Sequence, residues 1–194
     1  MDENQEKELA LLAECNKYLQ ENDIPIVSSI HDQIRFRKNV EKTHDQDSLI
    51  EFVIKEKKYD LAKKLIENGV FCDLENNKGS TPLIRACIQG NEEIVDLLLT
   101  KKEVNVNHED RRQLATPIIF ATIANQKNIV KKLIDHGAFV TMKDVELCSA
   151  LDHARNAIGN DCLEILQAAE NEQIKSKSKT DKTPNTASKT RNIR

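Results

Sequence analysis

The sequence lacks tryptophan and has few aromatic residues of any kind, which make up 4% of its 194 residues. Leucine, isoleucine, valine and alanine must therefore supply most of the core. Such a core suits stacked short helices better than a sandwich of aromatic and β-branched strands. With 39% hydrophobic and 31% charged residues, the chain can build one sizeable core or one repeat array rather than two independent domains.

Long apolar runs and paired cysteines are also missing. No run approaches the roughly 18 to 20 residues that cross a bilayer, and the opening MDENQEKE is acidic where a secretory signal is basic. The five cysteines form no CxxC pair, which favours free thiols in a reducing compartment over disulfides or structural zinc. We therefore expect a soluble, cytoplasmic protein without membrane contact.

The sequence contains no recognisable catalytic motif. No GxGxxG or P-loop is present to hold phosphate. Cys148, Asp152 and His153 superficially resemble a nucleophile set, but adjacent residues on a helix point apart. Metal sites place histidines four residues apart or beside cysteines, so we predict no catalytic residue, no cofactor and no metal ligand. The histidines are scattered instead: His31, His44, His108, His136 and His153.

Residues 79–99, GSTPLIRACIQGNEEIVDLLL, have the pattern of one helix-turn-helix unit. Thr81 can cap a helix whose first position suits Pro82, and Gly90 can supply the left-handed residue that ends it. Two such short helices are marginal alone, so neighbouring units must cover their apolar faces. The apolar stripes consist of Leu83, Ala86 and Cys87 in the first helix and Ile94, Val95, Leu98 and Leu99 in the second.

The same pattern recurs along the chain. Ser48, Thr116 and Ser149 correspond to Thr81, at successive offsets of 33, 35 and 33 residues. The two additional residues must lie in the polar connection at 100–115, where an insertion costs little. The unit that begins at Ser149 is the weakest match, and we interpret it as a C-terminal cap.

With this period and its Thr-Pro units, the sequence resembles the ankyrin repeat family over residues 47–169. The resemblance implies an all-α solenoid of helix-turn-helix units with short β-turn hairpins. The expected divisions are an N-terminal helical cap at 1–46, an ankyrin repeat domain at 47–171 with units at about 47–80, 81–115, 116–148 and 149–171, and a disordered basic tail at 172–194.

The chain departs from the family pattern at two positions of the repeat. The histidine that follows Thr-Pro-Leu in the family is replaced by Ile84, Ile119 and Asp152. The turn glycine present as Gly79 becomes leucine in the next two repeats. We therefore expect irregular hairpins near Leu114 and Leu147 and a stack less stable than an idealised one.

Looking like an ankyrin repeat protein implies binding of a protein partner on a concave face, made of turn tips and inner-helix surfaces. Ile88 and Ile123 are the best candidates for apolar contact, with packing against the adjacent repeat as the alternative. The expected contact residues are Asn77, Lys78, Ser80, Ile88 and Gln89 in the second repeat, Arg112, Gln113, Ala115, Ile123 and Ala124 in the third, and Val145, Glu146, Cys148, Asn156 and Ala157 in the fourth.

The two ends leave alternatives open. Helices at 3–22 and 26–40 would form a hairpin over the first repeat, or else a separate functional domain. From residue 171 onward there are seven Lys or Arg and two acidic residues, so this segment carries about +5 and the body about −8. A solvated flexible tail is the plain interpretation, and the alternatives are contact with nucleic acid or an acidic surface, or a transport signal.

The leading hypothesis is a non-enzymatic, monomeric adaptor, scaffold or inhibitor that binds a protein rather than nucleic acid. The alternative is a pathogen effector or regulator that acts through its basic tail and contacts nucleic acid. That alternative would place the chain in a host cytosol or in a nucleus.

Overall fold

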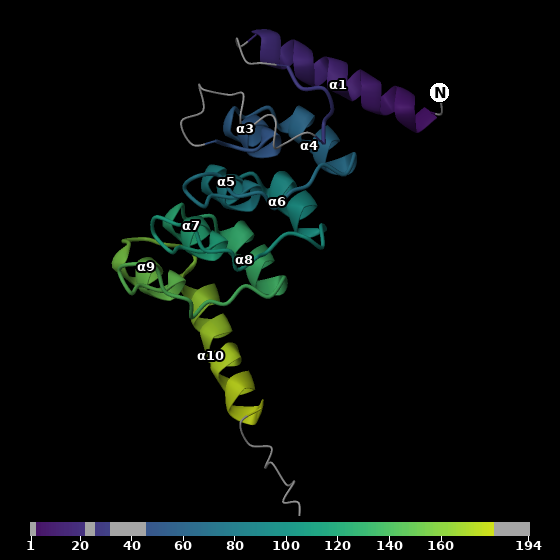
Figure 1. Cartoon of the computed structure of the whole chain (residues 1–194). Coiled ribbons are helices and arrows are strands. Elements are labelled where there is room, and N and C mark those ends of the chain that lie inside the picture. Colours follow the sequence, from purple (N-terminus) through teal and green to yellow (C-terminus); the bar gives the residue numbers. More distant parts are fainter. Residues whose placement is uncertain (1–2, 22–25, 32–45, 181–194) are drawn as a thin grey trace, which may run out of the picture.

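The structure, a computed structural model, describes residues 3–21, 26–31 and 46–180. Over these ranges the chain is helical apart from loops, turns and one isolated antiparallel bridge between Lys143 and Ser149, which confirms the all-α class. Four helix pairs stack in order, and α1 lies at the end next to the first pair (Figure 1). The helices are α1 (Glu3–Glu21), α3 (Leu49–Lys55), α4 (Tyr59–Glu67), α5 (Pro82–Gln89), α6 (Glu92–Leu99), α7 (Pro117–Ile123), α8 (Lys127–Asp135), α9 (Ala150–Asn156) and α10 (Leu163–Thr180).

The pair α5–α6 forms as its sequence predicts. The Thr81 hydroxyl accepts a hydrogen bond from the Ile84 N–H at 3.4 Å, and a proline occupies the first turn. Gly90 ends α5 with a left-handed φ of 72°. Asn91 then caps α6 by accepting from the Ile94 N–H at 2.9 Å. Gly90 thus fixes the end of α5, and the Asn91 side chain fixes the start of α6.

Apolar stripes from all four pairs merge into one continuous core. The predicted stripe residues of α5 are fully buried, as are those of α6 apart from the partly buried Leu99. Four of the five free cysteines are buried among them as small apolar side chains, whereas Cys148 is partly exposed. The corresponding buried residues are Leu61, Ala62, Leu65 and Ile66 in the first pair, Ile118, Ala121, Ile129, Val130 and Leu133 in the third, and Leu151, Ala154, Cys162 and Leu166 in the fourth.

The turn that contains Leu147 has the geometry of the turn that contains Gly79. The φ angle is 62° at Leu147 and 77° at Gly79. The Leu147 N–H donates to the Asp144 carbonyl at 2.9 Å, and the Gly79 N–H donates to the Asn76 carbonyl at the same distance. The prediction of an irregular hairpin near Leu147 is therefore wrong. The leucine adopts the glycine conformation instead, at a cost of about 1 to 2 kcal/mol for its Cβ.

The turn that contains Leu114 is one residue longer. Here the Asp110 N–H reaches the Ala115 carbonyl, five residues on, whereas the Asn76 N–H reaches Ser80, four residues on. The Asp110 carboxylate fills the wider turn by accepting the Ala115 N–H at 3.0 Å. The predicted irregularity near Leu114 is confirmed, and one of the two inserted residues lies in this turn.

Leu147→Gly is expected to stabilise the fold by about 0.5 to 1 kcal/mol, because it removes the left-handed strain and the lost side chain is 73% exposed. Val145→Gly is the matched control. Val145 lies in the same turn without a positive φ, so its replacement by glycine should lower the stability of the fold. Urea unfolding midpoints measure both. A lower urea midpoint for Leu147→Gly than for the unmodified chain would contradict the prediction that Leu147 is strained.

The N-terminal segment packs on the first repeat through one helix. The predicted helix at 3–22 is confirmed as α1, which buries Leu11, Cys15 and Leu19. Lys64 of α4 lies 2.7 Å from Glu14 of α1. The second predicted helix is wrong over residues 26–31, which form bends and turns, and its remainder lies outside the described residues.

Helix α10 continues well past the predicted end of the repeats. The predicted start of the disordered tail, residue 172, falls inside this helix, so residues 172–180 are helical instead. One cause is Gln173, whose side chain donates to the Ala138 carbonyl at 2.8 Å and accepts from the Val140 N–H at 3.1 Å. The rest of the predicted tail, 181–194, lies outside the described residues. Within the described part of the chain, no helix combines the length and apolarity needed to cross a membrane.

Candidate functional site

Backbone hydrogen bonds join the turns of neighbouring repeats. The Lys78 carbonyl accepts from the Arg111 N–H at 2.9 Å, and the Gln113 carbonyl accepts from the Val145 N–H at 2.7 Å. A Cβ added at Gly79 would lie 2.4 Å from the Arg111 nitrogen, so this close approach requires glycine. We call residues 76–80, 110–115 and 144–148 the turn row.

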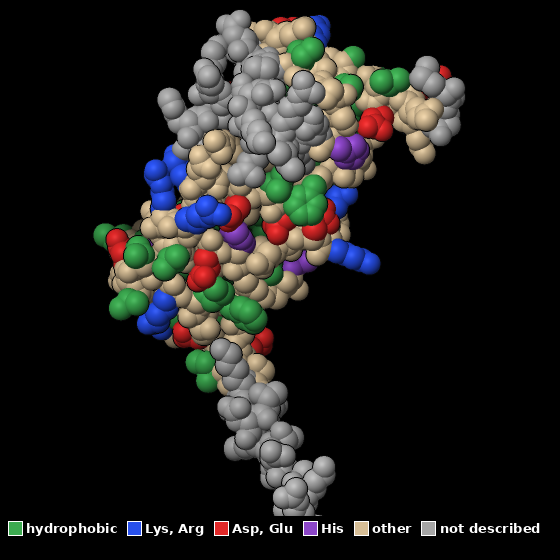
Figure 2. Space-filling model, in the orientation of Figure 1, with side chains coloured by type: hydrophobic (Ala, Val, Ile, Leu, Met, Phe, Trp, Pro, Cys, Tyr) green, Lys and Arg blue, Asp and Glu red, His purple; other side chains and the backbone are tan. Residues whose placement is uncertain are grey.

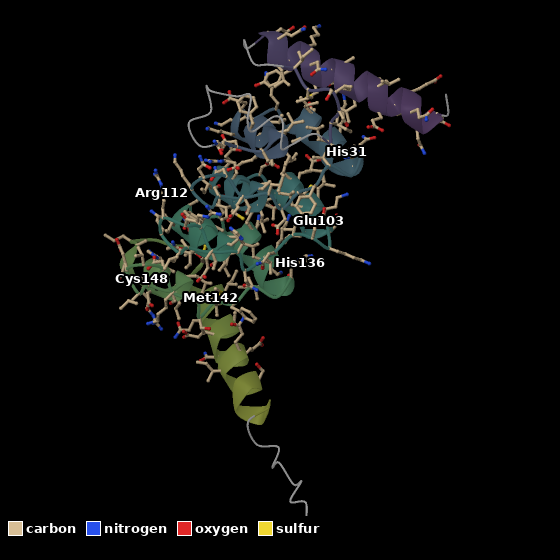
Figure 3. The ribbon with its side chains drawn as sticks, in the orientation of Figure 1. His31, Glu103, Arg112, His136, Met142 and Cys148 are labelled. Atoms are coloured by element: carbon tan, nitrogen blue, oxygen red, sulfur yellow. The ribbon has the colours of Figure 1, made fainter. Side chains whose placement is uncertain are left out.

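The turn row lies along one side of the stack. Figure 3 places Arg112 and Cys148 on this side and Glu103 and His136 toward the opposite side. Helices α3, α5, α7 and α9 lie on the side of the turn row, and α4, α6 and α8 lie on the other side (Figure 1). The turn row and the exposed residues of α5, α7 and α9 therefore form one surface, which we call the inner face. It carries the turn tips and inner-helix positions that the sequence analysis names as expected contact residues.

A hollow of about 190 Å³ opens on the inner face between the second and third repeats. It brings together five of the predicted contact residues, and its wall combines apolar side chains with positively charged ones. Figure 2 shows Lys and Arg side chains near hydrophobic ones along the left-hand edge of the stack. The lining residues are Lys78, Ser80, Ile84, Arg85, Ile88, Asp110, Arg112, Gln113 and Phe120.

The predicted contact residues differ in accessibility. Two of them are buried, since Ser80 is 8% and Ala115 1% exposed, and each directly precedes the residue that caps a helix. Gln89 is half-buried, since its side chain donates to the Lys55 carbonyl at 3.0 Å. Lys78, Ala124 and Cys148 are also half-buried. The exposed residues are Asn77, Ile88, Arg112, Gln113, Ile123, Val145, Glu146, Asn156 and Ala157.

Sequence reasoning missed four residues that line the hollow: Ile84, Arg85, Asp110 and Phe120. Arg85 and Phe120 occupy corresponding positions, each four residues after the threonine that opens its helix. The sequence did contain a signal for Arg85, because it is the one charged residue in the helix PLIRACIQ. It marks the side of α5 that is not buried in the core.

A cluster of buried polar side chains connects the first repeat with Arg85 of the hollow. Asp47 and Glu51 are fully buried, and the Asn76 amide donates to both, at 2.8 Å and 3.1 Å. Lys55 Nζ lies 2.9 Å from Asp47, and Arg85 Nη2 lies 3.4 Å from Glu51. Arg85 therefore lines the hollow while its guanidinium is held by a carboxyl group of the preceding repeat.

The Glu51 carboxyl is the most perturbed acid in the described part of the chain. Burial, followed by the neighbouring Asp47 carboxylate, raises the pKa of Glu51 from 4.5 to about 8, although Arg85 acts to lower it. At neutral pH the Glu51 carboxyl is therefore largely protonated.

A second polar cluster lies at the turn of the fourth repeat. Asp144, Cys148 and His153 bring their side-chain ligand atoms within 4.8 Å of one another, and the described residues contain no other such group of metal-ligand type. Burial raises the pKa of Asp144, but hydrogen bonds from His153, Cys148 and Glu146 outweigh it and hold the pKa below its usual value. The sequence analysis grouped Cys148 and His153 with Asp152 and missed Asp144. Asp152 instead completes a capping box with Ser149.

A family model of ankyrin repeats, with three copies of the repeat, matches residues 14–110 and again 49–144. The chain therefore belongs to the ankyrin repeat family, whose members are generally non-enzymatic modules for protein–protein interaction. The match begins within α1, so it reaches further toward the N-terminus than the sequence resemblance.

Among curated proteins, the chain is similar to the ankyrin repeat and SAM domain-containing protein 6 of Rattus norvegicus. The two are 33% identical over 95 residues, which are 48% of this chain and 11% of that protein. The chain thus spans only a small part of this relative's length.

Proposed function

We propose that the chain binds a protein partner on its inner face, as an adaptor, scaffold or inhibitor that performs no covalent chemistry. The observation that carries the proposal is the hollow between the second and third repeats. Its lining includes the partly exposed apolar side chains of Ile88 and Phe120 and the basic side chains of Lys78 and Arg112. At protein interfaces a few anchor residues that fill pockets supply most of the binding energy, and an apolar hollow can receive such an anchor.

The charges around the hollow favour an acidic partner segment. Lys78 and Arg112 are among its lining residues, and the acid in the same lining, Asp110, has its carboxylate occupied by N–H groups of its own turn. We therefore propose a partner that inserts an apolar side chain beside Ile88 and places carboxylates near the two cations. Rim charges of this kind act mainly on association rate and specificity.

The double variant Ile88→Asp with Lys78→Glu should weaken binding at least tenfold, or about 1.4 kcal/mol, because it replaces the anchor and reverses a rim charge. The partner would first be recovered by affinity capture with the intact chain. Its Kd for the intact chain and for the variant would then be measured by calorimetry.

The matched control is Ile174→Asp with Lys102→Glu, which makes the same chemical changes at exposed residues outside the inner face. It should bind as the intact chain does. If the Ile88→Asp, Lys78→Glu variant retained its helical circular dichroism and its full affinity, the inner face would be the wrong surface.

A further inference from the structure

Asp144 and Cys148 are the first and last residues of the turn at 144–148, the third turn of the turn row. The bridge between Lys143 and Ser149 closes this turn, and within it the Asp144 N–H donates to the Cys148 carbonyl at 3.0 Å. His153, in the second turn of α9, completes the cluster with its Nε2 atom 2.5 Å from Asp144 Oδ2. Backbone geometry therefore positions a carboxylate, a thiol and an imidazole before anything binds.

The two carboxylate oxygens of Asp144 have separate roles. Oδ1 accepts the N–H groups of Glu146 and Cys148 at 2.9 and 3.0 Å, which fixes the plane of the carboxylate. Oδ2 points to His153. Orienting contacts of this kind hold metal-ligating side chains in place. The start of α9 is held as well, because Ser149 and Asp152 form a capping box.

Among the second, third and fourth repeats, whose turns the structure describes, only the fourth has a ligating side chain at all three positions. The turns align through the backbone bonds that close them, from Asn76 to Ser80, from Asp110 to Ala115 and from Asp144 to Cys148. Five residues further on stand Arg85, Phe120 and His153 respectively. The third repeat folds with alanine and phenylalanine where the fourth has cysteine and histidine, so the fold itself does not require the thiol or the imidazole.

We propose that Asp144 Oδ2, Cys148 Sγ and His153 Nε2 bind one Zn²⁺ ion. This mixed oxygen, sulfur and nitrogen set suits Zn²⁺ rather than Mg²⁺ or Ca²⁺, which prefer oxygen ligands alone. Three protein ligands leave the fourth tetrahedral position to a water molecule. On binding, the Cys148 thiol releases its proton to solvent, and His153 carries its remaining proton on Nδ1.

Cys148 Sγ lies within 4.8 Å of the other two ligand atoms, and the Asp144 and His153 atoms must move apart. Two ligands about 2.1 Å from a tetrahedral zinc lie about 3.4 Å apart, so the 2.5 Å separation between His153 and Asp144 must widen by about 1 Å. A rotation of the His153 ring supplies this, since its side chain is 20% exposed. The surrounding charge also favours a cation, because three acids, Asp144, Glu146 and Asp152, lie near Cys148. The nearby cations are two, Lys143 and Arg155, and Arg155 lies 3.6 Å from Asp152.

The first test uses the full chain and Co²⁺, which replaces Zn²⁺ and reports its ligands by absorption. One equivalent should produce a thiolate-to-cobalt charge-transfer band, and Zn²⁺ should abolish that band and raise the melting temperature of the chain. Absence of the band in the unmodified chain overturns the proposal, whether or not any variant folds.

Cys148→Ala and His153→Phe copy the side chains of the third repeat. Each should weaken Zn²⁺ binding at least a hundredfold, since the loss of an outer-shell partner alone costs about 10- to 100-fold. Ser80→Ala, at the position corresponding to Cys148, and His136→Gln, at an exposed histidine, should bind Zn²⁺ normally. A band that persists in Cys148→Ala, or unchanged affinity in His153→Phe, overturns the site. If Asp144 and His153 form only a structural pair, the variants lose stability and Zn²⁺ leaves the melting temperature of the unmodified chain unchanged.

Discussion

Leu98→Ala is expected to lower the free energy of unfolding by about 2 to 5 kcal/mol, because it leaves a cavity in a core that cannot close around it. Leu98 is fully buried in α6, and its register partners in the neighbouring helices, Leu65 and Leu133, are fully buried too. A loss of this size would be a large fraction of the 5 to 15 kcal/mol that stabilises a typical domain.

Urea unfolding followed by circular dichroism measures the effect. Ile158→Ala is the control, since Ile158 is fully exposed and its truncation should change stability by less than about 0.5 kcal/mol. If Leu98→Ala cost no more than this control, the repeat register would be wrong.

The second large effect concerns Glu51 and pH. The pKa of Glu51 is raised in the folded state to about 8 from 4.5, so between these values the folded chain binds more protons than the unfolded chain. The contribution of Glu51 to stability must therefore fall as pH rises from 4.5 to 8 and level off above that, opposite to the behaviour of an acid with a lowered pKa. The loss should reach a few kcal/mol, since each pKa unit corresponds to about 1.4 kcal/mol.

Glu51→Gln isolates this contribution because the amide cannot ionise. Chemical unfolding at a series of pH values should give a steeper decline for the unmodified chain than for the variant, with the variant gaining in relative stability toward pH 8. Asn76→Ala offers a second comparison, because it removes the amide that donates to both buried acids. Parallel curves for the unmodified chain and Glu51→Gln would show that Glu51 does not carry the raised pKa.

The repeat fold could be predicted because its signals are local. Thr81, Pro82, Gly90 and Asn91 fix helix ends within a few residues, and the recurring apolar stripe sets the register. The length of α10 could not be predicted in this way. Its polar composition suggested disorder, whereas the contacts of Gln173 with the loop after α8 depend on packing between segments some 35 residues apart.

The site was predicted less completely than the fold. Ile88, Arg112 and Gln113 lie where the family resemblance implied, on one surface around the hollow. Ser80 is buried because it directly precedes Thr81, the residue that caps α5. Its position next to the turn tip in the sequence does not reveal that the backbone has already turned toward the core there. The contact between Asp144 and His153 forms because the turn at 144–148 brings the chain back beside α9. Their spacing of nine residues in the sequence does not indicate such a contact.

The backbone bonds between neighbouring turns have a consequence for how this surface can change over evolution. Because main-chain atoms of Lys78, Arg111, Gln113 and Val145 hold the turns together, the spacing of the tips does not depend on what their side chains are. Substitutions at the tips can therefore alter which molecule is recognised without moving the framework that presents them. Gly79 is the exception in the second turn, since any side chain there would push against the neighbouring backbone and separate the two repeats.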